Sequence, residues 1–232
     1  MTVKGVLFDF SGTLFRVEST ESWLRAALTD SSLTLPEAEL TRTAQALERA
    51  GALPGGAPPA EAPTGELAGL WALRDRSAEE HRAAFTGLSR QVALPTPSLH
   101  DALYDRHMTP SAWSPYPDAA KVLAALRRRG VAVGVVSNIG WDLRPVFRAH
   151  GLDAYVDVYV LSYEHGAQKP DPRLFALACA ELGVDARDTL MVGDDRRADG
   201  GAAALGCRVH FVNHLPIAGR PDGLRPVLEL LD

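Results

Sequence analysis

The chain has 232 residues, enough for one or two domains with a large buried core. Its hydrophobic and charged fractions, 46% and 23%, are ordinary for a soluble globular protein, and its formal net charge of −5 disfavours a broad basic surface for nucleic acid. No apolar run approaches the ~20 residues of a membrane helix, so we expect no membrane partner. The two cysteines, Cys179 and Cys207, form neither a disulfide framework nor a metal pattern, and we expect a cytoplasmic protein.

The predicted elements begin with a short apolar strand at 6–8 that ends in Asp9. From 16 to 113 no strand pattern is evident. Helical patterns appear there instead, at 21–28, 36–50, 65–74 and 78–91, and the turn-rich stretch 51–63 divides them. We therefore predict an all-helical insertion over 16–113.

Helices and strands alternate in the second half of the chain. Apolar, β-branched runs predict strands at 131–136, 156–161, 189–192 and 208–212. Helical patterns with cap residues or a following glycine lie around these strands, at 118–129, 143–150, 172–182 and 198–205. This alternation predicts an α/β fold with a doubly wound parallel sheet, formed by 1–15 and 114–232.

Carboxylates follow two of the predicted strands. Asp9 follows the first strand, and Asp194 with Asp195 follows the strand at 189–192, with Asp199 a little further on. Because ligands bind at the carboxyl ends of the strands in such sheets, we expect these side chains to meet. A carboxylate can act as a nucleophile that forms an aspartyl-phosphate, and a few more carboxylates suit Mg²⁺. Asp9 is therefore the candidate nucleophile, and Asp194, with Asp195 or Asp199, extends a candidate metal site.

Three further side chains are candidates for holding phosphate in the same pocket. Ser137 and Asn138 follow the strand at 131–136 and can donate hydrogen bonds to phosphoryl oxygens. Lys169 precedes a helix and can offset the negative charge of the nucleophile and the phosphate. Only three of the 24 basic residues are lysines, so a compact ammonium group at this position is informative. The expected partner is a small phosphorylated substrate.

Four short motifs, in this order, resemble those of the haloacid dehalogenase superfamily of hydrolases: DFSGTL at 9–14, VVSN at 135–138, KPDPRLF at 169–175 and VGDDRRADGGAAALG at 192–206. The resemblance implies that Asp9 is the nucleophile and that water hydrolyses the intermediate. It implies that Mg²⁺ contacts Asp9, the backbone carbonyl of Ser11 and Asp194, with Asp199 ligating the ion or holding a metal-bound water. The helical insertion would be a cap that closes over the pocket and selects the substrate.

In the turn that follows Asp9, Thr13 matches the motif of the superfamily and Ser11 departs from it. In the resemblance, Thr13 belongs to a turn that couples cap closure to the site, and we place it among the phosphate-binding residues. The family's phosphatases carry an aspartate where this chain has Ser11. That aspartate protonates the leaving oxygen and then activates the water.

A serine hydroxyl cannot take over this role, because it does not titrate near neutral pH and no base adjoins Ser11 in the sequence. Losing a general acid and base typically removes about 10²–10⁴-fold in rate. The backbone carbonyl of Ser11 is still available to a cation, whatever the side chain. We therefore expect Mg²⁺ and phosphate to bind, while turnover of ordinary phosphomonoesters is slowed.

Two other functions stay open. Dehalogenases of the superfamily expel a halide, which needs no proton, and use no metal, although three acids without a cation would repel one another. A phosphate-binding protein with little turnover would also lack the acid. A residue of the insertion could restore it, and Glu18, Glu21 and His107 are candidates because they flank the ends of the insertion.

Overall fold

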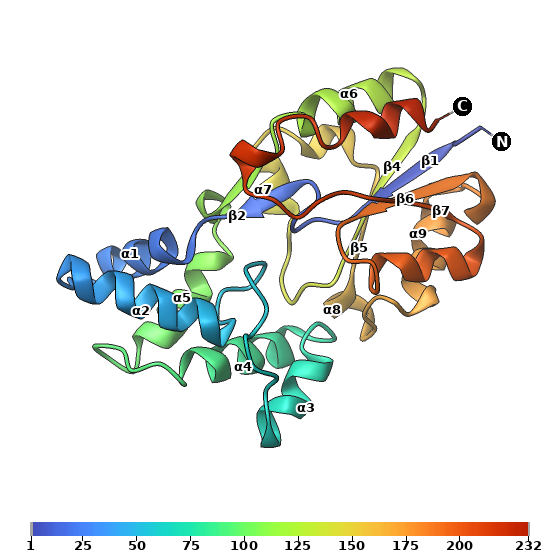
Figure 1. The fold of residues 1–232 in the computed structure, drawn as a ribbon. Coiled ribbons are helices and arrows are strands. Elements are labelled where there is room, and N and C mark those ends of the chain that lie inside the picture. The colour runs from blue at the N-terminus through green and yellow to red at the C-terminus, as the bar shows by residue number, and fades with distance from the viewer. Residues whose placement is uncertain (1, 232) are drawn as a thin grey trace.

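The structure, a computed structural model, describes residues 2–231 and is built around a parallel sheet of five strands in the order β5-β4-β1-β6-β7 (Figure 1). The strands are β1 (Gly5–Phe8), β4 (Ala132–Ser137), β5 (Val158–Leu161), β6 (Thr189–Gly193) and β7 (Arg208–Phe211). The central strand is β1, in which Phe8 lies beside Val135 on one side and Val192 on the other. The predicted α/β fold with a parallel sheet is confirmed.

Helices cover both faces of this sheet, because its central strand is apolar on both faces. Val6 and Phe8 belong to one buried cluster, whereas Leu7 between them belongs to a second cluster with Phe175 of α9. The helices of this part are α6 (Ala119–Arg128), α7 (Arg144–Ala149), α8 (Ser162–His165) and α9 (Pro172–Leu182). The segment predicted as a helix at 198–205 is a 3-10 helix, Asp199–Leu205.

Five α-helices stand between Val17 and Trp113, in the part of the chain that separates β1 from β4. They are α1 (Thr20–Asp30), α2 (Glu37–Ala50), α3 (Gly65–Leu73), α4 (Ala78–Ser89) and α5 (Leu99–His107). Figure 1 shows them gathered into a group apart from the sheet. We call residues 18–112 the helical insertion. None of the helices within residues 2–231 is both long and apolar enough to cross a membrane.

The region from 16 to 113 differs from the prediction in two respects. A short antiparallel pair, β2 (Phe15–Val17) with β3 (Trp113–Pro115), opens and closes the insertion, although no strand was expected there. Three residues are too few to show an alternating pattern. The pair straddles the predicted boundaries at 15/16 and 113/114, which stay predictions, and residues 1 and 232 lie outside the described part of the chain.

The helix α5 was also not expected. Its buried side chains keep a helical spacing, but two of them, His100 and His107, are histidines, so apolar residues alone do not show the stripe.

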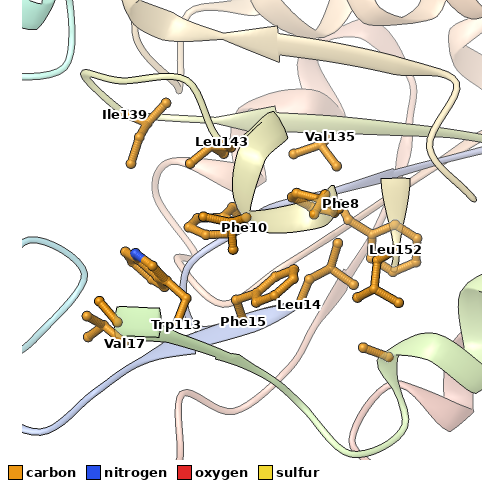
Figure 2. Packing of buried hydrophobic residues seen from close by; sticks show 14 of the residues in the cluster. Phe8, Phe10, Leu14, Phe15, Val17, Trp113, Val135, Ile139, Leu143 and Leu152 are labelled. Atoms are coloured by element: carbon orange, nitrogen blue, oxygen red, sulfur yellow. The ribbon is translucent and has the colours of Figure 1, made fainter. Parts of the chain in front are cut away.

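Aromatic side chains fix the β2–β3 pair to the sheet (Figure 2). The ring of Phe10 lies 4.6 Å from that of Trp113 and 5.1 Å from that of Phe15, and Phe15 lies 5.0 Å from Phe147, all between centroids. Such pairs contribute about 0.5–1.5 kcal/mol each beyond the burial of their area. Because Phe10 directly follows Asp9, this packing also fixes the chain that carries the candidate nucleophile.

Candidate active site

The residues singled out in the sequence meet at the carboxyl end of the sheet. Asp9 follows β1, Ser137 ends β4, and Asp194 follows β6. A cavity of about 1200 Å³ opens at this end. Its walls include Ser11, Ser137, Asn138, Lys169 and the candidate metal ligands, together with residues of the helical insertion. The parallel strands therefore bring together side chains that are far apart in the sequence.

The centre of the site is a buried ammonium group between two buried carboxylates. Lys169 Nζ donates to Asp9 Oδ1 at 2.7 Å and to Asp199 Oδ1 at 2.6 Å. Lys169, Asp9 and Asp199 are only 4%, 8% and 0% exposed. Burial alone would lower the pKa of Lys169, but the carboxylates of Asp199 and Asp9 raise it above its usual value, so the ammonium form persists.

The carboxyl group of Asp9 is under opposing influences. Burial raises its pKa, and the Lys169 ammonium lowers it; the neighbouring charges of Asp199 and Asp194 then raise it again. A cation beside Asp9 would add to the effect of Lys169 and favour the ionised, nucleophilic form. The chemistry of this set of residues thus calls for more positive charge than one lysine supplies.

The three acids predicted as metal ligands fit a small hard cation. One carboxylate oxygen each from Asp9, Asp194 and Asp199 lies within 4.8 Å of the others. Within residues 2–231 the carbonyl of Ser11 accepts no hydrogen bond, so it also has a lone pair to offer. Oxygen ligands of this kind suit Mg²⁺. Asp195, the alternative to Asp199, instead accepts from two backbone N–H groups, those of 197 and 198.

The space around Asp199 depends on Gly193. A Cβ atom at this position would lie 2.0 Å from Asp199 Oδ2, so no other residue fits without moving the carboxylate. The second oxygen of Asp199 accepts from the backbone N–H of Asp195 at 3.0 Å. The motif at 192–206 therefore positions Asp199 in two ways: the N–H of Asp195 donates to its carboxylate, and Gly193 leaves room for it.

Thr13 does not line the cavity, contrary to the role predicted for it. It was expected to contact phosphate, but its side chain is fully buried and its hydroxyl donates to Asp194 Oδ1 at 3.3 Å. It lies behind Asp194 and positions this carboxylate. Gly12 lies in front, at φ +83°, where a Cβ atom would meet both Asp194 Oδ2 and His214 Nδ1 at 2.4 Å.

Asn138 also has a different role from the one expected. Its amide donates to the Lys169 carbonyl at 3.0 Å and accepts from the Lys169 N–H at 2.6 Å, so both ends of the amide hold the backbone of Lys169. Ser137 is the better candidate for a phosphate donor. It lines the cavity, and within residues 2–231 its hydroxyl forms no hydrogen bond.

The helical insertion reaches the site next to Ser11. The Ser11 hydroxyl lies 3.4 Å from the carbonyl oxygen of Gly55, which belongs to the turn-rich stretch between α2 and α3. Of the three candidate acids of the insertion, Glu18 and Glu21 line the cavity but are engaged by arginines, Arg106 and Arg25.

His107 is wrong as a candidate acid. It is fully buried among aromatic rings, does not line the cavity, and has its pKa lowered to about 3 by burial.

Two residues of the site, His214 and Arg220, lie beyond the last motif, and no motif singles them out. His214 Nδ1 lies 2.5 Å from Asp194 Oδ2, the carboxylate oxygen that Thr13 leaves free. Arg220 is buried, lies over the Tyr116 ring, and donates to the carbonyls of Gly12 and Thr13. The segment after β7 therefore holds the turn that follows the candidate nucleophile.

Replacing Lys169 with methionine should destabilise the fold as well as the site. Two buried carboxylates would then lose their counter-charge, and breaking a buried ion pair in this way costs about 3–5 kcal/mol of unfolding free energy. Urea unfolding in metal-free buffer measures the loss. The matched control is Lys121→Met on the exposed side of α6, which should change stability by less than about 0.5 kcal/mol. Equal effects of the two substitutions would contradict this account of the triad.

A protein family and individual curated proteins are similar to this chain. The family of haloacid dehalogenase-like hydrolases matches residues 3–206. Phosphoserine phosphatase from Thermus thermophilus is 38% identical over 113 residues, which cover 48% of this chain and 42% of that protein. (S)-2-haloacid dehalogenase 4A from Burkholderia cepacia is 35% identical over 126 residues, which cover 52% of this chain and 54% of that protein. The chain spans about half the length of these curated relatives.

Solved structures share the fold. A magnesium-bound HAD-hydrolase from Bacillus subtilis superposes with a TM-score of 0.65 over 91% of this chain and 89% of that one, at 17% sequence identity. At this identity the likeness concerns the fold. The family match over residues 3–206, with the four motifs gathered at one cavity, shows that the chain belongs to the haloacid dehalogenase-like hydrolases.

Proposed function

We propose that this hydrolase is a Mg²⁺-dependent phosphatase that transfers a phosphoryl group to Asp9. The observation that carries the proposal is the cluster of three carboxylates, Asp9, Asp194 and Asp199, two of which, Asp9 and Asp199, share the ammonium group of Lys169. One ammonium group leaves this cluster strongly negative, and a divalent cation with the phosphoryl group of a substrate would complete it. Similarity to a phosphatase, the phosphoserine phosphatase described above, supports the same reaction class.

The residues of the chain have distinct roles in this reaction. Asp9 attacks phosphorus and the ester oxygen leaves, and water then releases inorganic phosphate from Asp9. Lys169 lowers the pKa of Asp9 and orients its carboxylate through the 2.7 Å hydrogen bond, and the Ser137 hydroxyl can donate to a phosphoryl oxygen. Asp194 and Asp199, with the carbonyl of Ser11, would hold Mg²⁺, which supplies neutralising charge at the phosphoryl oxygens when bound.

A metal-independent dehalogenase is the second candidate, and similarity to (S)-2-haloacid dehalogenase 4A favours it. Ser11 is compatible with this reaction, because a halide leaves without a proton. The carboxylates argue against it. Without a cation, Asp194 and Asp199 repel the negative charge of Asp9 and of a carboxylate substrate, and Lys169 alone must offset all of them. A phosphate-binding protein with little turnover remains the third candidate.

We further propose a small phosphorylated metabolite as the substrate and the cytoplasm as the location. A cavity of about 1200 Å³ has room for a small molecule. The two buried cysteines are free thiols, which suits a reducing compartment.

A panel of phosphate esters tests the proposed function. With Mg²⁺, the purified protein should release phosphate from at least one ester, and EDTA should abolish the release. Asp9→Asn should show no activity, because the amide is not a nucleophile. If no ester is hydrolysed and metal-free protein releases chloride from a 2-chloroacid, the dehalogenase candidate replaces the phosphatase. Phosphate binding without any product would favour the third candidate.

Ser11→Asp tests whether the missing acid limits the rate. The variant should hydrolyse alkyl phosphates faster than the wild type, by up to about 10²-fold, because an acid at this position protonates the leaving oxygen. Steady-state kinetics of both proteins on one alkyl phosphate measure the gain. Ser11→Asn is the control, because asparagine has the same size as aspartate but no titratable group. A gain with asparagine would contradict the expectation, and no gain with aspartate would show that another residue of the site already transfers the proton.

A further inference from the structure

A buried carboxyl group of the helical insertion lines the cavity. Asp75 lies in the short connection between α3 and α4, is 5% exposed, and lines the same cavity as Asp9, Asn138 and Lys169. Sequence patterns do not distinguish it from the other acids of the insertion. In the fold it differs from Glu18 and Glu21, because no arginine donates a hydrogen bond to its side chain within residues 2–231.

Hydrogen bonds tie this connection to the loops of the candidate active site. Ser162 Oγ donates to the Asp75 carbonyl at 2.5 Å and accepts from the N–H of Ile139, the residue after Asn138. Arg76 Nε donates to the Gly166 carbonyl at 3.0 Å, and Gln168, directly before Lys169, donates to the Ala72 carbonyl at 2.9 Å. The backbone of Asp75 is therefore fixed against the same loops that place Asn138 and Lys169.

The carboxylate of Asp75 itself has few partners. Arg74 Nε lies 3.5 Å from Oδ2, and His81 Nε2 lies 3.8 Å from Oδ1, both beyond a good hydrogen bond. A carboxylate this deeply buried is costly without donors, so a proton or a ligand group would stabilise it.

The hydroxyl of Tyr104 lies 2.6 Å from His81 Nδ1. If it donates there, Nε2 carries the hydrogen of the neutral ring and points it toward Asp75.

The charges around Asp75 favour a carboxyl group that can hold a proton. Burial raises its pKa, while Arg74 on its own segment and Lys169 across the cavity act in the opposite direction. His81 adds no positive charge, because burial lowers its pKa well below the usual value. A general acid needs a pKa closer to neutrality than that of an exposed aspartate, and these surroundings move Asp75 in that direction.

We propose that Asp75 is the general acid and base that Ser11 does not supply. When Asp9 attacks phosphorus and the P–O bond of the ester breaks, the leaving oxygen takes the proton of the Asp75 carboxyl group and departs as an alcohol. The Asp75 carboxylate then takes a proton from the attacking water, whose oxygen bonds to phosphorus as the P–O bond to Asp9 breaks. Inorganic phosphate leaves, and Asp75 is protonated again. This inference rests on the proposed phosphatase function.

Asp75→Asn separates proton transfer from structural support, because it keeps the shape of the side chain. The variant should lose about 10²–10⁴-fold in kcat/KM for an alkyl phosphate, but less than about tenfold for p-nitrophenyl phosphate, whose leaving group needs no proton. The fall of wild-type kcat/KM for the alkyl ester at high pH should also vanish. Glu79→Gln, which removes an exposed carboxylate at the start of α4, is the control and should behave as the wild type.

The outcomes distinguish the two hypotheses. A wild type that hydrolyses neither ester overturns the phosphatase function and this inference with it. A wild type that hydrolyses both, beside an Asp75→Asn variant that loses equal factors on the two esters, overturns only the role of Asp75. Should Asp75→Asn fail to fold, Asp75→Glu replaces it. Because this variant keeps a carboxyl group, the ratio of its kcat/KM values for the two esters should equal that of the wild type, and its kcat/KM for the alkyl ester should still fall at high pH. Loss of both features would overturn the proposal.

Discussion

One buried ammonium group holds the candidate active site together. Lys169 bonds Asp9 on one side and Asp199 on the other, and all three side chains are almost completely withdrawn from solvent. Two buried carboxylates this close would repel each other without it. Much of the surrounding structure serves this contact: the amide of Asn138 clamps the backbone of Lys169, and the bare backbone of Gly193 leaves room for Asp199.

The sheet and the main catalytic candidates could be predicted from the sequence for a physical reason. Buried parallel strands appear as short β-branched runs, and the residues after them meet at one edge whatever their separation in the chain. Asp9, Lys169, Asp194 and Asp199 therefore emerge from the order of the motifs. The individual contacts of a side chain do not follow from that order. Thr13 and Asn138 lie at the right edge, yet they bond Asp194 and Lys169 rather than facing the cavity as free donors.

Other features left no pattern to find. His214 and Arg220 reach the turn after Asp9 from the last segment of the chain, and only the return of the chain past β7 brings them there. Asp75 is one of many acids in a helical region, and its burial at the cavity results from packing between elements distant in sequence. The helix α5 was hidden because histidines fill part of its buried stripe.

Ser11 packs against Gly55 of the helical insertion. Its hydroxyl faces the carbonyl of Gly55, and a Cβ atom at position 55 would lie 2.7 Å from Ser11 Oγ and 2.6 Å from the Trp113 ring. The small residues at 11 and 55 thus let the insertion come close to the nucleophile. An insertion packed this closely can contribute its own chemical groups to the reaction, and Asp75 is such a group, because it belongs to the insertion and lines the cavity.

The most direct measurement of the central claim is the chemical state of Asp9 during turnover. Protein mixed with a phosphate ester and Mg²⁺ is quenched in acid, and its peptides are analysed by mass spectrometry. Phosphate is expected on the peptide that contains Asp9 during turnover, and none on the same peptide of Asp9→Asn. Consumption of the ester while Asp9 stays unmodified would contradict the proposed phosphoryl transfer to Asp9. So would a protein that does not react with phosphate esters but forms an ester bond between Asp9 and the carbon of a 2-haloacid.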